Sequence, residues 1–156
     1  MKKPLVLIAT HVFALLAGAG LGVYFLPIVA APPAPSATEV QAAAKGARFQ
    51  GDFRRDLKGS DALHWGEGKV AIGPDAISLS GRIAPGPAYK LYLVPEFVET
   101  HDDFVRLKAK SLPVGDIRTF ENFIVPLQPG TRLEDYKAVV VWCEAFSQFI
   151  TSARYR

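Results

Sequence analysis

The sequence has little material for covalent chemistry and none for internal cross-links. Its 156 residues include one cysteine, Cys143, so no disulfide can form within the chain. A glycine-rich phosphate-binding loop, a His-Glu-x-x-His segment and a nucleophile elbow are also absent. The part after residue 46 holds no internal repeat and no low-complexity run. These absences argue against the common enzyme classes and leave Cys143 as the best candidate for chemistry.

The positive charge of the chain does not indicate a nucleic-acid partner. The net charge is +3 and the pI is about 9.1, but acidic and basic residues nearly balance from Gly46 onward. The excess comes mainly from Lys2, Lys3 and Lys45. Nucleic-acid binders carry a clustered basic face or a basic groove lined with aromatic residues, and the sequence contains no such cluster. We therefore expect no nucleic-acid partner.

The N-terminal segment predicts a membrane anchor. Residues 5–31 contain no Asp, Glu, Lys or Arg, and about 20 apolar residues suffice to cross the hydrocarbon core of a bilayer. Lys2 and Lys3 precede this run, and the positive-inside rule puts them in the cytoplasm. We expect a single pass through an inner membrane, with a cytoplasmic N-terminus over residues 1–4 and a transmembrane signal-anchor over 5–31. The rest of the chain is then periplasmic or, more generally, extracytoplasmic.

A cleaved secretory signal is the competing interpretation of this segment. Ala30 and Ala31 are small residues at plausible cleavage positions. However, the apolar run is longer than the roughly 7–15 residues of a typical signal core, and Pro32 would follow a bond cleaved after Ala31. Both interpretations place the domain outside the cytoplasm, and the length of the run favours the uncleaved anchor.

Residues 32–46 are expected to form a Pro/Ala-rich linker. Pro32, Pro33 and Pro35 favour an extended polyproline conformation, and the rest of the segment lacks apolar periodicity. A linker of this kind would hold the following domain away from the bilayer.

Residues 47–156 predict one all-β domain. Short apolar runs, many with period-two alternation, end at Gly or Pro about every ten residues. Helical periodicity is scarce, although Thr131 and Glu134 could cap one helical turn over 131–136. We expect an antiparallel β-sandwich of about eight to nine short strands. The clearest strands are expected over residues 69–72, 76–83, 89–94, 105–108, 120–127, 138–143 and 146–152.

Cys143 ends a run of β-branched residues that is typical of a strand covered on both faces. It alternates with Val139 and Val141, which favours burial in the core, where free cysteine behaves as a small hydrophobic residue. The other interpretation is a reactive thiol, lined by Trp142 and Phe146, whose pKa is lowered by a nearby base or cation. The sequence leaves both interpretations open.

His64 is the residue best suited to tune such a thiol. It lies just before a predicted strand and is either a loop histidine bonded to backbone or a base or ligand partner of Cys143. A haem or copper site built on Cys143 and His64 is a further option, although the sequence requires no cofactor and predicts no metal centre. The segment 99–103, with one His and two Asp, is expected to be a solvated loop.

Several segments resemble the DM-thirteen domain family. Residues 135–146, which read Asp-Tyr-Lys-Ala-Val-Val-Val-Trp-Cys-Glu-Ala-Phe, are similar to the signature of that domain. His64 followed by Gly68, Gly86-Pro87 before a strand, and the aromatic segment 120–126 also match in the expected order. The resemblance covers residues 47–156. One departure is that residues 121–123 read Glu-Asn-Phe where the family has a tyrosine.

The resemblance implies a DOMON-like or jelly-roll-like sandwich with a role in electron transfer. The family occurs in bacterial membrane or exported proteins and beside haem-binding DOMON and membrane cytochrome domains, and its candidate redox cysteine corresponds to Cys143. We therefore expect a membrane-tethered redox module of the cell envelope, with His64 tuning Cys143, more than an independent enzyme. A redox partner protein or a membrane cytochrome has to supply a second redox-active group, such as a sulfur, a haem or a metal, because one thiol cannot complete a two-cysteine cycle. The alternative is a non-catalytic binding or scaffolding sandwich with a buried structural cysteine.

Overall fold

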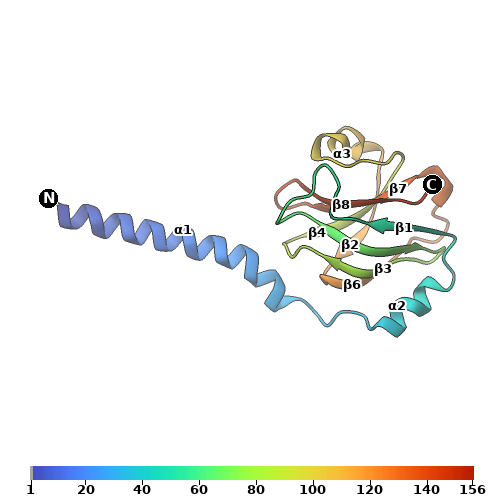
Figure 1. Ribbon diagram of the computed structural model, residues 1–156, viewed down its shortest axis with the longest axis horizontal. Coiled ribbons are helices and arrows are strands. Elements are labelled where there is room, and N and C mark those ends of the chain that lie inside the picture. The colour runs from blue at the N-terminus through green and yellow to red at the C-terminus, as the bar shows by residue number, and fades with distance from the viewer. Residues whose placement is uncertain (1) are drawn as a thin grey trace.

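The computed structural model describes residues 2–156, which form a long N-terminal helix followed by a β-sandwich (Figure 1). Met1, part of the expected cytoplasmic N-terminus, lies outside the described residues. Helix α1 covers Lys2–Ala30 and projects from one end of the sandwich. The side chains of Thr10 and His11 hydrogen-bond the Leu7 carbonyl oxygen, each at 2.8 Å, so these polar groups are satisfied within the helix. With 29 residues, about 43 Å, α1 is long and apolar enough to cross a membrane.

The sandwich consists of two four-stranded antiparallel sheets, so the predicted all-β class is confirmed. The strand orders are β1-β2-β3-β6 and β5-β4-β7-β8. Strand β1 contacts β8, and β5 contacts β6, so the edges of the two sheets meet on both sides. The strands are β1 Phe49–Phe53, β2 Gly66–Ile72, β3 Ala76–Ile83, β4 Tyr89–Val94, β5 Leu112–Ile117, β6 Glu121–Pro126, β7 Ala138–Cys143 and β8 Gln148–Arg154.

The segment expected to be a linker contains a helix. After an irregular stretch at 31–36, helix α2 covers Ala37–Ala44 and packs against β3 and β6. It begins with a capping box, in which the Ser36 hydroxyl accepts the Glu39 N–H and the Glu39 carboxylate accepts the Ser36 N–H. Val40 is buried and holds this helix on the sandwich. The extended conformation is therefore limited to the proline-rich part of the segment.

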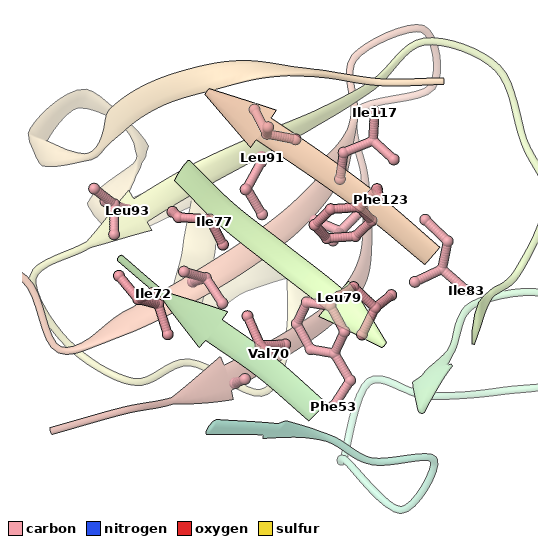
Figure 2. Packing of buried hydrophobic residues seen from close by; sticks show 14 of the residues in the cluster. Phe53, Val70, Ile72, Ile77, Leu79, Ile83, Leu91, Leu93, Ile117 and Phe123 are labelled. Carbon is pink, nitrogen blue, oxygen red and sulfur yellow. The ribbon is translucent and has the colours of Figure 1, made fainter. Parts of the chain in front are cut away.

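The main core fills the space between the two sheets. Alternate residues of each strand point inward, and Figure 2 shows their side chains meeting between the strands. Each fully buried side chain of this size stabilises the fold by about 1.5–3 kcal/mol. The residues labelled in the figure are Phe53, Val70, Ile72, Ile77, Leu79, Ile83, Leu91, Leu93, Ile117 and Phe123.

A second apolar cluster covers the outer face of the β5-β4-β7-β8 sheet. Helix α3, His101–Leu107, and the following 3₁₀ helix η1, Lys108–Lys110, lie over this face. Phe104 of α3 packs against Trp142 of β7, with ring centroids 4.9 Å apart. Strand β7 is therefore covered on both faces, as its β-branched run predicts.

Two local predictions differ from the structure. The predicted strand over 105–108 lies in α3 and η1, because Thr100 caps this helix by accepting the Asp103 N–H. The predicted capped turn near Thr131 is a 3₁₀ helix, η2, over Leu133–Asp135, and no side chain caps its start. Both segments are too short for apolar periodicity to distinguish a strand from a helical turn.

Candidate functional site

Strand β7 directs Cys143 into the space between the sheets. Because side chains alternate along a strand, Cys143 shares its face with Val139 and Val141 and belongs to the main core. Tyr89 of β4 pairs directly with Cys143 across the sheet, so the two side chains are neighbours on this inner face. The thiol thus lies at the end of the core rather than in its middle, since Cys143 is the last residue of its strand.

The thiol of Cys143 is shielded and protonated. The residue is 2 % exposed, and Sγ donates a hydrogen bond to the Pro87 carbonyl oxygen at 3.0 Å. Burial raises the pKa of Cys143, and the Glu144 carboxylate raises it further. The backbone N–H groups of Phe146 and Ala145 act in the opposite direction but do not cancel this effect. Of the two interpretations that the sequence leaves open, the structure favours burial in the core, and the resting thiol is not an activated thiolate.

A pocket of about 320 Å³ joins Cys143 to the surface at this end of the sandwich. The loop before β4, the turn between β7 and β8, and the loop before β2 form its walls together with α1. The lining residues are Gly20, Val23, Tyr24, Leu63, His64, Pro85, Gly86, Pro87, Tyr89, Cys143, Phe146, Gln148 and Ile150. The fold therefore brings Cys143, His64 and Phe146 to one pocket, although His64 is distant from the other two in the sequence.

His64 is held at the pocket by Asp61. The Asp61 carboxylate accepts hydrogen bonds from the backbone N–H groups of Leu63 and His64, at 2.7 and 2.8 Å, and its second oxygen lies 2.8 Å from His64 Nδ1. The bond from His64 lowers the pKa of Asp61, so this carboxylate is ionised at neutral pH. With Nδ1 bound to Asp61, Nε2 is the ring nitrogen left to exchange protons with a ligand or with solvent. No hydrogen bond joins His64 to Cys143 within the described residues.

The DM-thirteen signature seen in the sequence is matched by a family comparison. The family described as electron transfer DM13 matches residues 53–155, which include every strand from β2 to β8 and all of the pocket except its α1 wall. The chain belongs to this family. No curated protein and no solved structure matches the chain.

Trp142, the neighbour of Cys143, points away from the pocket of the DM13 domain. It lies in the second cluster, packed against Phe104 of α3, and its indole N–H is buried without a hydrogen-bond partner in the described part of the chain. Phe146, the other aromatic residue expected to line the site, does line the pocket and is 59 % exposed. Of the two predicted lining residues, only Phe146 lines the pocket that Cys143 lines.

A polar network that sequence reasoning missed lies at the start of the turn that follows Cys143, on the outer face of the sheet with Trp142. The Glu144 carboxylate accepts a hydrogen bond from the Tyr92 hydroxyl, and its other oxygen lies 2.7 Å from Lys108 Nζ. Burial alone would raise the pKa of Glu144, but the bonds from Lys108 and Tyr92 outweigh it and hold this pKa below its usual value. The Glu144 N–H donates to the Ala88 carbonyl oxygen at 3.0 Å, so the turn after β7 is bound to the loop before β4.

The donor set of the DM13 domain does not complete a metal centre. Among residues 2–156, no group of three or more His, Cys, Asp or Glu is placed to hold a metal ion. Cys143 and His64 would supply two ligands at most, so a copper or haem iron at this pocket would need further ligands from another molecule. The segment 99–103 forms the capped start of α3, where His101 Nδ1 lies 2.8 Å from Asp102 Oδ1.

Proposed function

We propose that this chain is a membrane-tethered module of the cell envelope whose redox chemistry centres on Cys143. The observation that carries the proposal is the pocket shared by Cys143 and His64 in a domain of the electron transfer DM13 family. In this proposal α1 crosses an inner membrane once. The positive-inside rule then puts Lys3 in the cytoplasm and the sandwich on the periplasmic side.

The proposed reaction is thiol–disulfide exchange with a disulfide-bearing partner protein. Cys143 Sγ forms a bond with one partner sulfur, the partner's S–S bond breaks, and the Cys143 proton passes to the released thiolate. The sulfur of Cys143 is oxidised, and the released partner sulfur is reduced. Because the chain has one cysteine, a second thiol has to attack the mixed disulfide and return Cys143 to the thiol state.

His64 supports this reaction by carrying the proton. A thiol whose pKa is raised by burial needs a base to become a nucleophile, and a positioned histidine is the commonest such base. Asp61 fixes the imidazole through Nδ1, which leaves Nε2 as the acceptor. In this role His64 would take the proton of Cys143 and give it to the leaving partner thiolate.

The test is the reaction of the full chain, in detergent, with a small aromatic disulfide that releases a coloured thiol. We expect one mixed disulfide per wild-type chain and none in Cys143→Ser. The rate should fall on the order of a hundredfold in His64→Gln, at the lower end of what a positioned base contributes. His101→Gln is the matched control, because His101 also bonds a neighbouring aspartate but does not line the pocket. Equal rates in the two histidine variants would exclude the role of His64.

The second candidate is a non-catalytic binding or scaffolding module, and the burial of Cys143 favours it. In this case the wild-type thiol would react with the disulfide only after the chain is unfolded in denaturant. Cys143→Ser would then change the free energy of unfolding but not the binding of a partner, whereas substitutions in the loops around the pocket would weaken that binding. Reaction of the folded chain would rule this candidate out.

A further inference from the structure

The most exposed large apolar side chains of the sandwich gather at the Cys143 end. Outside α1, three such side chains stand out in the described chain: Leu63 at 59 %, Val105 at 49 % and Phe146 at 59 % exposure. A single exposed apolar residue is ordinary. Here, however, Leu63 and Phe146 come from separate loops and line the same pocket as Cys143, whereas Val105 lies on α3. This end of the domain thus has an apolar rim.

The number of α1 residues needed to cross a bilayer indicates the depth at which this apolar rim lies. A hydrocarbon core of about 30 Å needs about 20 helical residues, and 20 residues from Leu5 end at Tyr24. Tyrosine is also enriched where a transmembrane helix leaves the bilayer. Tyr24 lines the pocket together with Cys143. If α1 spans the membrane from Leu5, the mouth of the pocket is therefore level with the distal membrane–water interface.

The connection between α1 and the domain is too short for the Cys143 end of the sandwich to lie far from the end of α1. Only residues 31–36 separate α1 from α2, and six extended residues reach about 20 Å at most. The Asn122 side chain donates to the Pro35 carbonyl oxygen at 3.1 Å, which fixes the far end of this connection to the sandwich. Figure 1 shows the segment running from α1 along one side of the sandwich to α2.

Two cations lie where lipid headgroups would be. Lys90 and Arg118 line a second hollow together with the carboxylates Asp116 and Glu144, and Leu26 and Pro27 of α1 line it as well. Lys90 is paired with Asp116, its Nζ 2.8 Å from Oδ1, and Arg118 is exposed. Both carboxylates of the hollow are paired with lysines, Asp116 with Lys90 and Glu144 with Lys108, so Arg118 is the cation that suits a phosphate headgroup. The apolar rim suits the boundary with the acyl chains.

We propose that the Cys143 end of the sandwich rests on the distal leaflet of the same membrane, with Leu63 and Phe146 inserted at the headgroup–acyl boundary. The pocket then opens toward lipid, so whatever reaches Cys143 arrives through the membrane surface rather than from bulk water. This inference rests on the proposed membrane anchor, but it does not depend on the redox role of Cys143.

The test measures the depth of single labels on the full chain in lipid nanodiscs. Leu63→Cys, Phe146→Cys, Val105→Cys and Leu15→Cys are each made in a Cys143→Ser background and carry an environment-sensitive fluorophore. Quenchers are placed in the headgroup region, deep in the acyl chains, or in water. Cys143→Ala replaces the background if the serine variant does not fold.

We expect labels at Leu63 and Phe146 to be quenched several-fold more by the headgroup quencher than the label at Val105, which only the aqueous quencher should reach. The label at Leu15 of α1 reports the anchor and should respond to the deep quencher. If the labels at Leu63 and Phe146 behave like that at Val105 while the Leu15 label is embedded, the inference is overturned and the anchor stands. If the Leu15 label is also in water, the anchor and the inference fail together.

Discussion

Removing the carboxylate of Glu144 is expected to make Cys143 more reactive. Lys108 Nζ lies 2.7 Å from Glu144 Oε2, and this bond joins the turn that follows Cys143 to η1. A hydrogen bond to a charged group contributes about 1.5–3 kcal/mol, and pairs exposed to solvent contribute less. Because the side chains of Lys108 and Glu144 are each 32 % exposed, we expect Glu144→Gln to remove about 1 kcal/mol of the free energy that this bond contributes.

Two effects are both expected to increase the rate of alkylation of Cys143 in Glu144→Gln. A turn weakened by about 1 kcal/mol opens roughly fivefold more often, since 1.4 kcal/mol corresponds to about a factor of ten. The substitution also removes the negative charge of Glu144, which helps to raise the pKa of Cys143, so the thiolate fraction increases. Together we expect alkylation of Cys143 in Glu144→Gln to be about tenfold faster than in the wild type.

The assay is the rate of iodoacetamide modification of the folded full chain, followed by mass spectrometry at one fixed pH. Asp116→Asn is the matched control, because it removes the exposed ion pair with Lys90, at 2.8 Å, without touching the turn. Exposed pairs contribute little, so the control rate should stay within about twofold of the wild type. A Glu144→Gln rate equal to that of the control would refute the idea that this network protects Cys143.

Two further predictions concern stability. The folded-state pKa of Glu144 lies below its ordinary value of 4.5. The ionised carboxylate therefore stabilises the folded state fully above pH 4.5, and this stabilisation is lost as the pH falls through the folded-state pKa. Wild type should therefore lose more free energy of unfolding in urea between neutral pH and pH values below 4.5 than Glu144→Gln, and equal losses would contradict the shift. Gly86→Ala should destabilise the fold by about 1–3 kcal/mol, because a Cβ at Gly86 would collide with the Tyr89 hydroxyl. Gly46→Ala, whose Cβ would meet only Pro74 Cδ at 4.0 Å, should be near neutral in the same unfolding assay.

The strands with strong patterns could be predicted from the sequence alone. The alternation of apolar and polar residues predicts a strand over Ala76–Ile83, which are the observed bounds of β3. The β-branched run predicts β7 and its burial on both faces. Strand β5, over Leu112–Ile117, carries no comparable pattern because Pro113 and Gly115 interrupt it. It is specified by pairing with β4, which is a long-range contact that periodicity does not report.

The short helices were harder to predict because their signals are caps rather than periodicity. The Ser36–Glu39 capping box is visible in the sequence and could have indicated α2, but the surrounding alanines and prolines resemble a linker. Thr100 at the start of α3 is a similar signal. In both places one buried residue, Val40 or Phe104, decides the outcome by packing on the sandwich.

The candidate site could be predicted only in part. Cys143, His64 and Phe146 were identified from residue type, and the fold does bring them to one pocket. Its other features depend on contacts between distant segments. Tyr89 reaches the thiol by strand pairing, and the position of Tyr24 depends on how α1 leaves the sandwich. Neither contact leaves a pattern in the local sequence.

Two of the loops that wall the pocket, the loop before β4 and the turn after β7, also shield Cys143. Ala88 and Ser147 flank the pocket with φ of 52° and 49°, a left-handed conformation that costs a residue other than glycine roughly 1–2 kcal/mol. Glu144 makes two bonds at this point, from its N–H to the Ala88 carbonyl oxygen and from its carboxylate to Lys108, and we expect both to stabilise the closed arrangement. A partner or membrane surface that weakened these bonds would release both strained loops together and expose the thiol. If the Glu144 bonds do couple the two loops, a cysteine that is buried and protonated at rest would still be available to a reactant that breaks those bonds.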